Sequence, residues 1–162
     1  MLLDVKKFYS TYIEPKSYVI EVKTDVDSFE GFTLQTPACV AFEVKLVDDM
    51  CHLSLSGDVT VNSECARCLK PVSESFSLSN KYVFGLSDLQ NPDCELTFTE
   101  GGKLDLNELA VTEILGCAPL VFLCSENCKG LCQYCGKPKA QGCSCEQNPV
   151  DERLAILKQL LS

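Results

Sequence analysis

The stretch CSENCKGLCQYCGKPKAQGCSC, from Cys124 to Cys145, places six of the twelve cysteines of the chain within 22 residues. The gaps between these cysteines are three, three, two, seven and one residues. Thiolates at such spacings are typical of a structural metal site, in which four ligands surround one ion tetrahedrally. We therefore expect a loop that folds around a metal ion rather than around apolar side chains.

Within this stretch, Cys132 and Cys135 are separated by two residues, so one tight turn can offer both sulfurs to one ion. Gly136 follows directly, and glycine can take the positive φ that turns backbone N–H groups toward the sulfurs. Cys143 and Cys145 can supply the remaining two ligands. These four cysteines are our prediction for site one.

A second Cys-x-x-Cys pair, Cys65 and Cys68, lies in a turn between two expected strands and has no following glycine. Once site one is assigned, Cys124 and Cys128 are left over. The two remaining pairs make a second set of four, which predicts a second site that ties the sheet to the C-terminal region. The alternative is that Cys65 and Cys68 are incidental thiols.

Zinc is the metal that we expect, because closed spacings of this kind are the usual structural zinc pattern. An iron–sulfur cluster also takes four cysteines and stays open. Disulfides require an oxidising compartment, and the N-terminal MLLDVKKFYSTYIEP shows no signal peptide. A redox pair of the thioredoxin kind belongs in a βαβ unit, which this loop does not resemble.

Charge divides the chain into acidic and basic parts. Fourteen Lys and Arg stand against 23 Asp and Glu, a net charge of −9, which attracts basic proteins and repels bulk nucleic acid. Residues 84–117 carry seven carboxylates and one cation, whereas the cysteine loop carries Lys129, Lys137 and Lys139. We expect these three lysines to face a partner; the alternative is an ordinary solvated surface. No apolar run is long enough to cross a membrane.

Residues 18–84 alternate between apolar and polar side chains, which predicts antiparallel strands that are half buried against one core. The alternation runs through residues 18–22, 40–46, 51–61 and 76–84, with a turn at Asp48-Asp49 and a further short strand at Leu96 and Phe98. Cys39 and Cys51 are expected to be small core residues. The fold class that we predict is α+β, with an antiparallel, barrel-like sheet as its core.

Helical periodicity follows the strands. Asp105 to Glu108 resembles a capping box that opens a helix through about Leu115, with Gly116 as its stop. A second helix is expected over residues 148–161, where leucines recur on one face. The prediction is therefore a β domain over 1–118 that ends in a helix, and a unit over 119–162 of zinc loop and helix, so that helices flank the finger.

The chain offers little for catalysis. His52 is the single histidine, in mid-strand at the polar phase, and no nucleophile pairs with it by spacing. No phosphate-binding glycine loop is present, because Gly101-Gly102 lacks the surrounding motif. We therefore expect a protein that is not an enzyme and has no small-molecule substrate.

Four segments together resemble the YceD family of large ribosomal RNA subunit accumulation proteins. They are CARCL at residue 65, GGKLDLNELAVTEILGCAPL at residue 101, the cysteine stretch, and DERLAILKQLL at residue 151. The resemblance is close from Phe98 onward and looser over residues 57–84. It implies a bacterial or plastid protein that supports accumulation of 23S rRNA during large-subunit assembly, without known catalysis.

Three functional classes remain open from the sequence. The first is an assembly factor that binds the large-subunit precursor through a basic ribosomal protein or through 23S rRNA. The second is a zinc-ribbon interaction module that serves another machine, and the third is a thiol-based redox or zinc sensor. The N-terminus does not resemble a transit peptide, so we expect a bacterial, cytoplasmic protein.

Overall fold

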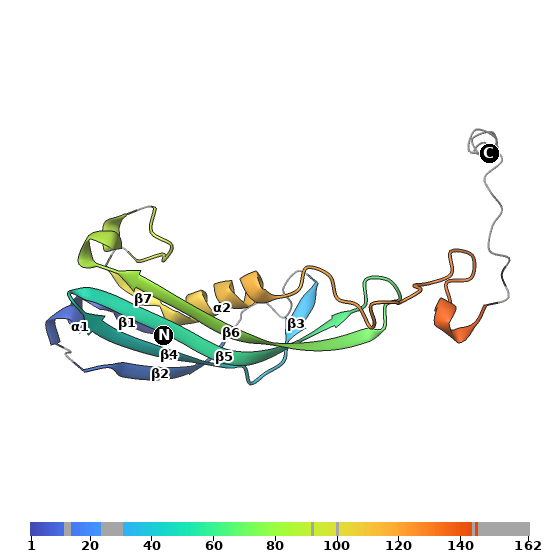
Figure 1. Cartoon of the computed structure of the whole chain (residues 1–162), viewed down its shortest axis with the longest axis horizontal. Helices are drawn as coiled ribbons and strands as arrows, with labels where there is room; N and C mark the ends of the chain where they lie inside the picture. Colours follow the sequence, from blue (N-terminus) through green and yellow to red (C-terminus); the bar gives the residue numbers. More distant parts are fainter. Residues whose placement is uncertain (12–13, 24–30, 92, 100, 144, 146–162) are drawn as a thin grey trace, which may run out of the picture.

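The computed structural model describes residues 1–11, 14–23, 31–91, 93–99, 101–143 and 145. The protein is α+β, as expected: a long antiparallel sheet has a helix along it and the cysteine loops at one end (Figure 1). The helix expected over 148–161 lies outside the described residues. Within those residues, no helix is long and apolar enough to cross a membrane.

The main sheet has five strands, in the order β2-β4-β5-β3, with β6 on the other edge of β5. They are β2 (Lys16–Glu21), β3 (Phe32–Leu34), β4 (Cys39–Val47), β5 (Met50–Glu64) and β6 (Pro71–Phe84). β4 and β3 pair with successive stretches of one edge of β5, and no described strand joins β2 to β6. The sheet is therefore open, and the expected barrel-like closure is wrong.

The hairpin of β4 and β5 turns at Asp48 and Asp49, as predicted. Both residues have positive φ, 49° and 59°, which is the backbone of a two-residue turn that matches the twist of its strands. The β5–β6 hairpin is much longer and pairs Cys51 with Phe84 at one end and Glu64 with Pro71 at the other. This hairpin carries its connecting loop to the end of the sheet at which the cysteine loops lie (Figure 1).

One apolar core lies on the inner face of the sheet. Alternate strand residues fill it, among them Val40, Phe42, Val44, Leu53, Leu55 and Phe84. Because the alternation has a period of two, Cys39 faces outward and is exposed, so its expected core position is wrong. Cys51 is in the opposite phase and is fully buried, as expected.

The helix α2 (Leu106–Cys117) covers this core with Leu106, Leu109, Ala110 and Ile114. Its N-cap is Asp105, whose side chain accepts a hydrogen bond from the Asn107 N–H at 2.9 Å. The helix continues through Gly116, which was expected to stop it. The Tyr82 hydroxyl donates to the Glu113 carboxylate, and this contact fixes α2 on β6.

Smaller elements complete the end of the sheet that lies away from the cysteine loops (Figure 1). They are β1 (Leu2–Asp4), α1 (Val5–Thr11), the 3₁₀ turn η1 (Leu86–Gln90) and β7 (Lys103–Asp105), which pairs with β1. The short strand expected at Leu96 and Phe98 is reduced to one bridge, Phe98 with Leu104. A second 3₁₀ turn, η2 (Lys139–Gln141), lies in the cysteine loop.

Candidate metal centre

The first cysteine cluster joins the tip of the β5–β6 hairpin to the segment after α2. Cys65 and Cys68 come from the hairpin loop, and Cys124 and Cys128 from the later segment; all four sulfurs lie within 4.8 Å of one another. The closest recorded approaches are 3.8 Å between the sulfurs of Cys65 and Cys128 and 3.5 Å between those of Cys68 and Cys124. These are the four cysteines of the second predicted set.

Backbone hydrogen bonds bring the two segments of this cluster together. The Ala66 N–H donates to the Phe122 carbonyl at 2.9 Å. The Arg67 guanidinium donates to the carbonyls of Glu126 and Cys128, at 3.2 and 3.1 Å. Arg67 therefore holds the later segment in place and satisfies backbone acceptors that the turn leaves unpaired. No motif in the sequence indicates this role for Arg67.

The second cluster is local. Its members are Cys132, Cys135, Cys143 and Cys145, the four cysteines of predicted site one, and their sulfurs also lie within 4.8 Å of one another. Cys132 is 5% exposed, whereas Cys135 is open to solvent. In the Cys-x-x-Cys pair of the first cluster, by contrast, both residues are buried: Cys65 is 0% exposed and Cys68 is 6% exposed.

The two Cys-x-x-Cys loops share one backbone pattern. In the first, the Leu69 N–H donates to the Cys65 carbonyl at 2.9 Å, and the Cys65 N–H donates to the Lys70 carbonyl at 2.8 Å. In the second, Gly136 and Lys137 make the corresponding bonds with Cys132, both at 2.8 Å. Each loop is thus a six-residue turn that closes on its first cysteine.

The fifth residue of each turn has positive φ, 59° at Leu69 and 69° at Gly136. Glycine takes this conformation at no steric cost, and leucine does so at a cost of ~1–2 kcal/mol. The first loop therefore makes the turn without the glycine that sequence reasoning looked for. The hydrogen bonds of the turn, made by the Leu69 N–H and by the Lys70 carbonyl with Cys65, hold Leu69 in this conformation.

Backbone N–H groups stabilise one thiolate in each cluster. The pKa of Cys65 is lowered to about 6, chiefly by the N–H of Cys124 and also by the N–H groups of Arg67 and Cys68. The pKa of Cys132 is lowered to about 6 by the N–H groups of Cys135 and Tyr134.

Two further sulfurs in each cluster, those of Cys68 and Cys124 and those of Cys143 and Cys145, have raised pKa values. The pKa of Cys124 is raised to about 12, first through its contact with Cys68, and that of Cys145 to about 12, first through its contact with Cys135. A thiolate disfavours a second negative charge beside it. Four thiolates can therefore coexist in each cluster only when a cation compensates them, which is the chemistry of a metal site.

The three lysines expected to meet a partner do not all lie together. Lys129 and Lys139 line one cleft beside the first cluster, together with Lys70, which sequence reasoning missed. Lys137 is exposed outside that lining, and its carbonyl closes the second turn. The sequence contains a signal for Lys70: it follows the Cys65/Cys68 pair by two residues, just as Lys137 follows the Cys132/Cys135 pair.

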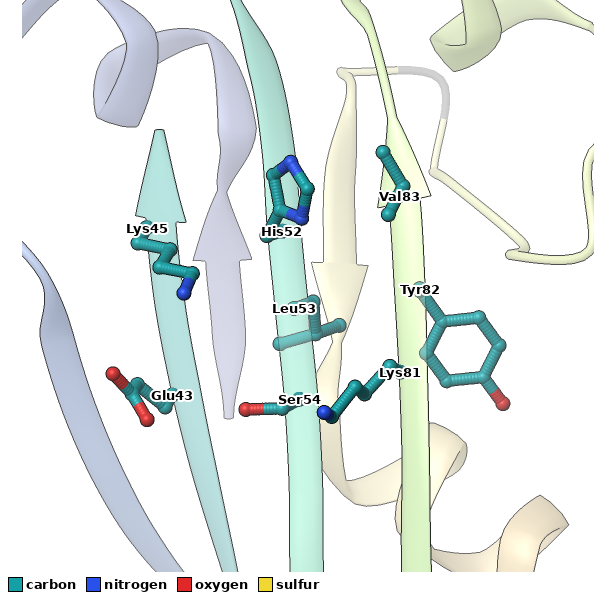
Figure 2. A pocket seen from close by; sticks show the side chains of 8 residues that line it. All are labelled: Glu43, Lys45, His52, Leu53, Ser54, Lys81, Tyr82 and Val83. Atoms are coloured by element: carbon teal, nitrogen blue, oxygen red, sulfur yellow. The ribbon is translucent and has the colours of Figure 1, made fainter. Parts of the chain in front are cut away.

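The single histidine lies on the outer face of the sheet. Figure 2 shows His52 on β5, between Lys45 on β4 and Val83 on β6; these residues line a pocket together with Ser54 and Lys81. Within the described residues, no hydrogen bond or ion pair joins His52 to a carboxylate or a thiol. Cys94 is partly buried and Cys117 is exposed, and neither belongs to a cluster.

This geometry defines a class of α+β protein. One four-cysteine cluster lies at the tip of a long hairpin, and a second lies in the loop that follows. The family model of the large ribosomal RNA subunit accumulation protein YceD matches residues 53–161, which include both clusters. The chain belongs to the YceD family, as its sequence suggested.

Similar curated proteins occur in mycobacteria. Uncharacterized proteins of Mycobacterium bovis and Mycobacterium tuberculosis are 26% identical to the chain over 148 residues, which covers 80% of this chain and 72% of theirs. No solved structure matches the chain.

Proposed function

We propose that the protein is a non-enzymatic factor in the biogenesis of the large ribosomal subunit, where it supports the accumulation of 23S rRNA. The observation that carries this proposal is the family match, which spans the β5–β6 hairpin, α2 and all eight clustered cysteines. The family's description names the accumulation of large ribosomal RNA. In this proposal, the two cysteine clusters support the region of the protein that binds its partner.

We propose zinc as the ion in both clusters. A tetrahedral ion with Zn–S bonds of ~2.3 Å separates its sulfurs by ~3.8 Å along each edge. The contacts of 3.8 and 3.5 Å in the first cluster agree with that edge. A four-iron cluster places several atoms between its thiolates, so sulfurs within 4.8 Å favour a single ion.

When bound, zinc compensates the thiolates and cross-links the chain; every other task falls to the residues of the protein. Cys65 and Cys132 accept N–H groups in the turns, and Arg67 orients the segment that carries Cys128. The resulting surface is a fixed platform for binding. It requires no acid, base or nucleophile.

The partner that we propose is the precursor of the large subunit, met in the bacterial cytoplasm through a basic ribosomal protein or through 23S rRNA. Two surfaces of opposite charge favour these two modes of contact. The carboxylates of residues 84–117 suit a basic protein, and the lysines beside the clusters suit phosphate. Neither mode involves a small-molecule substrate.

A complementation experiment tests this function. Deletion of the gene should lower the ratio of 23S to 16S rRNA, and the wild-type chain should restore it. His52→Ala should restore the ratio fully, whereas Cys132→Ser with Cys135→Ser should not. An unchanged ratio after deletion would exclude the ribosomal role, and loss of rescue by a folded His52→Ala protein would exclude a non-enzymatic one.

A further inference from the structure

A cleft of about 600 Å³ lies beside the first cysteine cluster and is closed on its other side by residues 138–142. Three lysines line it from three different segments: Lys70 ends the first turn, Lys129 lies between the clusters, and Lys139 begins η2. The described residues that line the cleft include no carboxylate. In a chain with a net charge of −9, this is a local concentration of positive charge.

The three lysines are available to a ligand. The ion pair found among the described residues joins the Met1 ammonium to Asp105 at 3.2 Å. None of the cleft lysines takes part in it. Glu126, the carboxylate nearest in sequence to Lys129, is exposed and is not part of the cleft lining. Among the described residues, therefore, no carboxylate partner has to be displaced from these lysines by a negatively charged ligand.

Fixed backbone forms the walls of the cleft. The Lys139 N–H donates to the Gly130 carbonyl at 2.9 Å, and the Leu131 N–H donates to the Arg67 carbonyl at 3.1 Å, so both loops are tied together. Gly130 has φ of 71°, and a Cβ there would lie 3.1 Å from the Arg67 oxygen. Because the frame is fixed, the lysines lose little further backbone freedom on binding.

The charge of the clusters does not cancel this preference. A four-thiolate zinc site carries two negative charges, and the first cluster borders the cleft through Cys68, Cys124 and Cys128. Backbone N–H groups, chiefly that of Cys124, already face the Cys65 sulfur, so part of that charge is compensated within the cluster. The lysines have long stems and reach into solvent, where an incoming phosphate can meet them.

We propose that this cleft binds the phosphate backbone of an RNA strand. The inference rests on the proposed function, which it deepens by assigning RNA, rather than a basic protein, to this part of the surface. A basic protein would meet like charge from Lys70, Lys129 and Lys139, which disfavours it here. The contact is to phosphate and carries no base readout, so we expect little dependence on sequence.

The test measures binding of a short fluorescent oligouridine to the full zinc-loaded chain by anisotropy at several salt concentrations. Three phosphate contacts to a single strand give a slope of log affinity against log salt of about −2, so affinity falls roughly twentyfold between ~50 and ~200 mM salt. The variant K70Q/K129Q/K139Q should lose this slope and keep its zinc. The matched control K7Q/K45Q/K81Q removes the same charge from exposed sites elsewhere and should retain the slope.

Each contrary result overturns the cleft as an RNA site. Equal loss in the control would mean that the affinity comes from overall charge, and binding of a basic peptide instead of oligouridine would mean a protein partner. Saturation by inorganic phosphate without competition against oligouridine would mean a site for the free ion. If the cleft variant loses zinc or does not fold, ultraviolet cross-linking of oligouridine to the wild-type chain decides. Cross-links should fall within residues 68–70 or 124–142, and cross-links confined to other surfaces refute the proposal.

The outcomes of the RNA-binding experiment can be distinguished from those of the complementation experiment. RNA binding in the cleft without an effect of deletion on 23S rRNA would retain the site and remove the ribosomal role. An effect of deletion without RNA binding would retain the role and direct the search to the acidic surface and a basic protein.

Discussion

The two cysteine clusters have the same turn in different settings. The first joins residues that are 56 to 63 positions apart in sequence, and its first pair is buried at the tip of a sheet. The second lies within Cys132–Cys145, with Cys135 open to solvent. Strand pairing and the Arg67 contacts bring the two segments of the first cluster together, whereas the turn of the second cluster closes by hydrogen bonds of its own backbone.

This difference indicates different tasks for a metal ion. An ion in the first cluster closes a long loop and fastens the segment after α2 to the sheet, which removes much freedom from the unfolded chain. An ion in the second cluster folds a short stretch that has little other support. The following predictions test this contrast, beginning with the largest effect.

Chelation of the metal should affect the second cluster most. Structural zinc contributes an apparent ~10–16 kcal/mol in small peptides, far more than a 14-residue loop can replace. We expect amide protection to vanish over residues 132–145 and to persist in β4 and β5. Hydrogen exchange with mass spectrometry, before and after chelation, measures both regions, and a loop that stays protected without metal would refute the contrast.

Paired serine substitutions should separate the clusters. Cys65→Ser with Cys68→Ser and Cys143→Ser with Cys145→Ser should each lower zinc from two ions per chain to one. Only the first pair should also destabilise the sheet, by at least ~2 kcal/mol, which lowers Tm by roughly 4–8 °C in a chain of this size. Metal analysis and calorimetry provide the readouts. Unchanged stoichiometry in the first variant would mean that the hairpin loop binds no ion.

Exchange of the turn residues should have smaller effects of opposite sign. Gly136→Ala places a side chain at φ 69° and should weaken the second site by ~1–2 kcal/mol. Leu69→Gly relieves the same strain in the first turn, although glycine adds freedom to the unfolded chain, so the net gain should be below ~1 kcal/mol. Competition with a metal indicator measures both, and a loss of affinity in Leu69→Gly would show that the leucine side chain supports the site.

Removal of the Tyr82 hydroxyl should change stability without affecting either cluster. Tyr82→Phe breaks the contact with Glu113 and should cost ~0.5–1.5 kcal/mol of unfolding free energy, because one hydrogen bond between β6 and α2 is lost. Zinc content should stay the same. Chemical denaturation with metal analysis checks both expectations, and zinc loss in this variant would mean that the sheet and the clusters unfold as one unit.

Much of the fold could be predicted because it depends on local pattern. The period-two strands, the turn at Asp48 and the start of α2 at Asp105 are each encoded by a few neighbouring residues. The grouping of the eight cysteines was also available, because spacing fixed one set and the remainder made the other. Cys39 was misplaced although the alternation of β4 already assigned it to the outer face.

Other features depend on contacts that are distant in sequence. The pairing of β1 with β7 joins Leu3 to Leu104, which no local signal indicates. The open sheet arises because β3 and β4 share one edge of β5. This arrangement depends on the whole chain rather than on a local sequence pattern. Positive φ at Leu69 contradicts the preference of leucine, and only its surroundings impose it.

The length of the β5–β6 hairpin limits how this family can change. Because side chains alternate between faces, deletion of one residue from each strand would turn the inner row outward and rotate the cysteine loop to the opposite side of the sheet. Deletion of two from each strand would restore both faces and shorten the arm by ~7 Å. In related proteins, arms of other lengths should therefore differ by even numbers of residues per strand, so that the reach of the tip evolves in discrete steps while its orientation is kept.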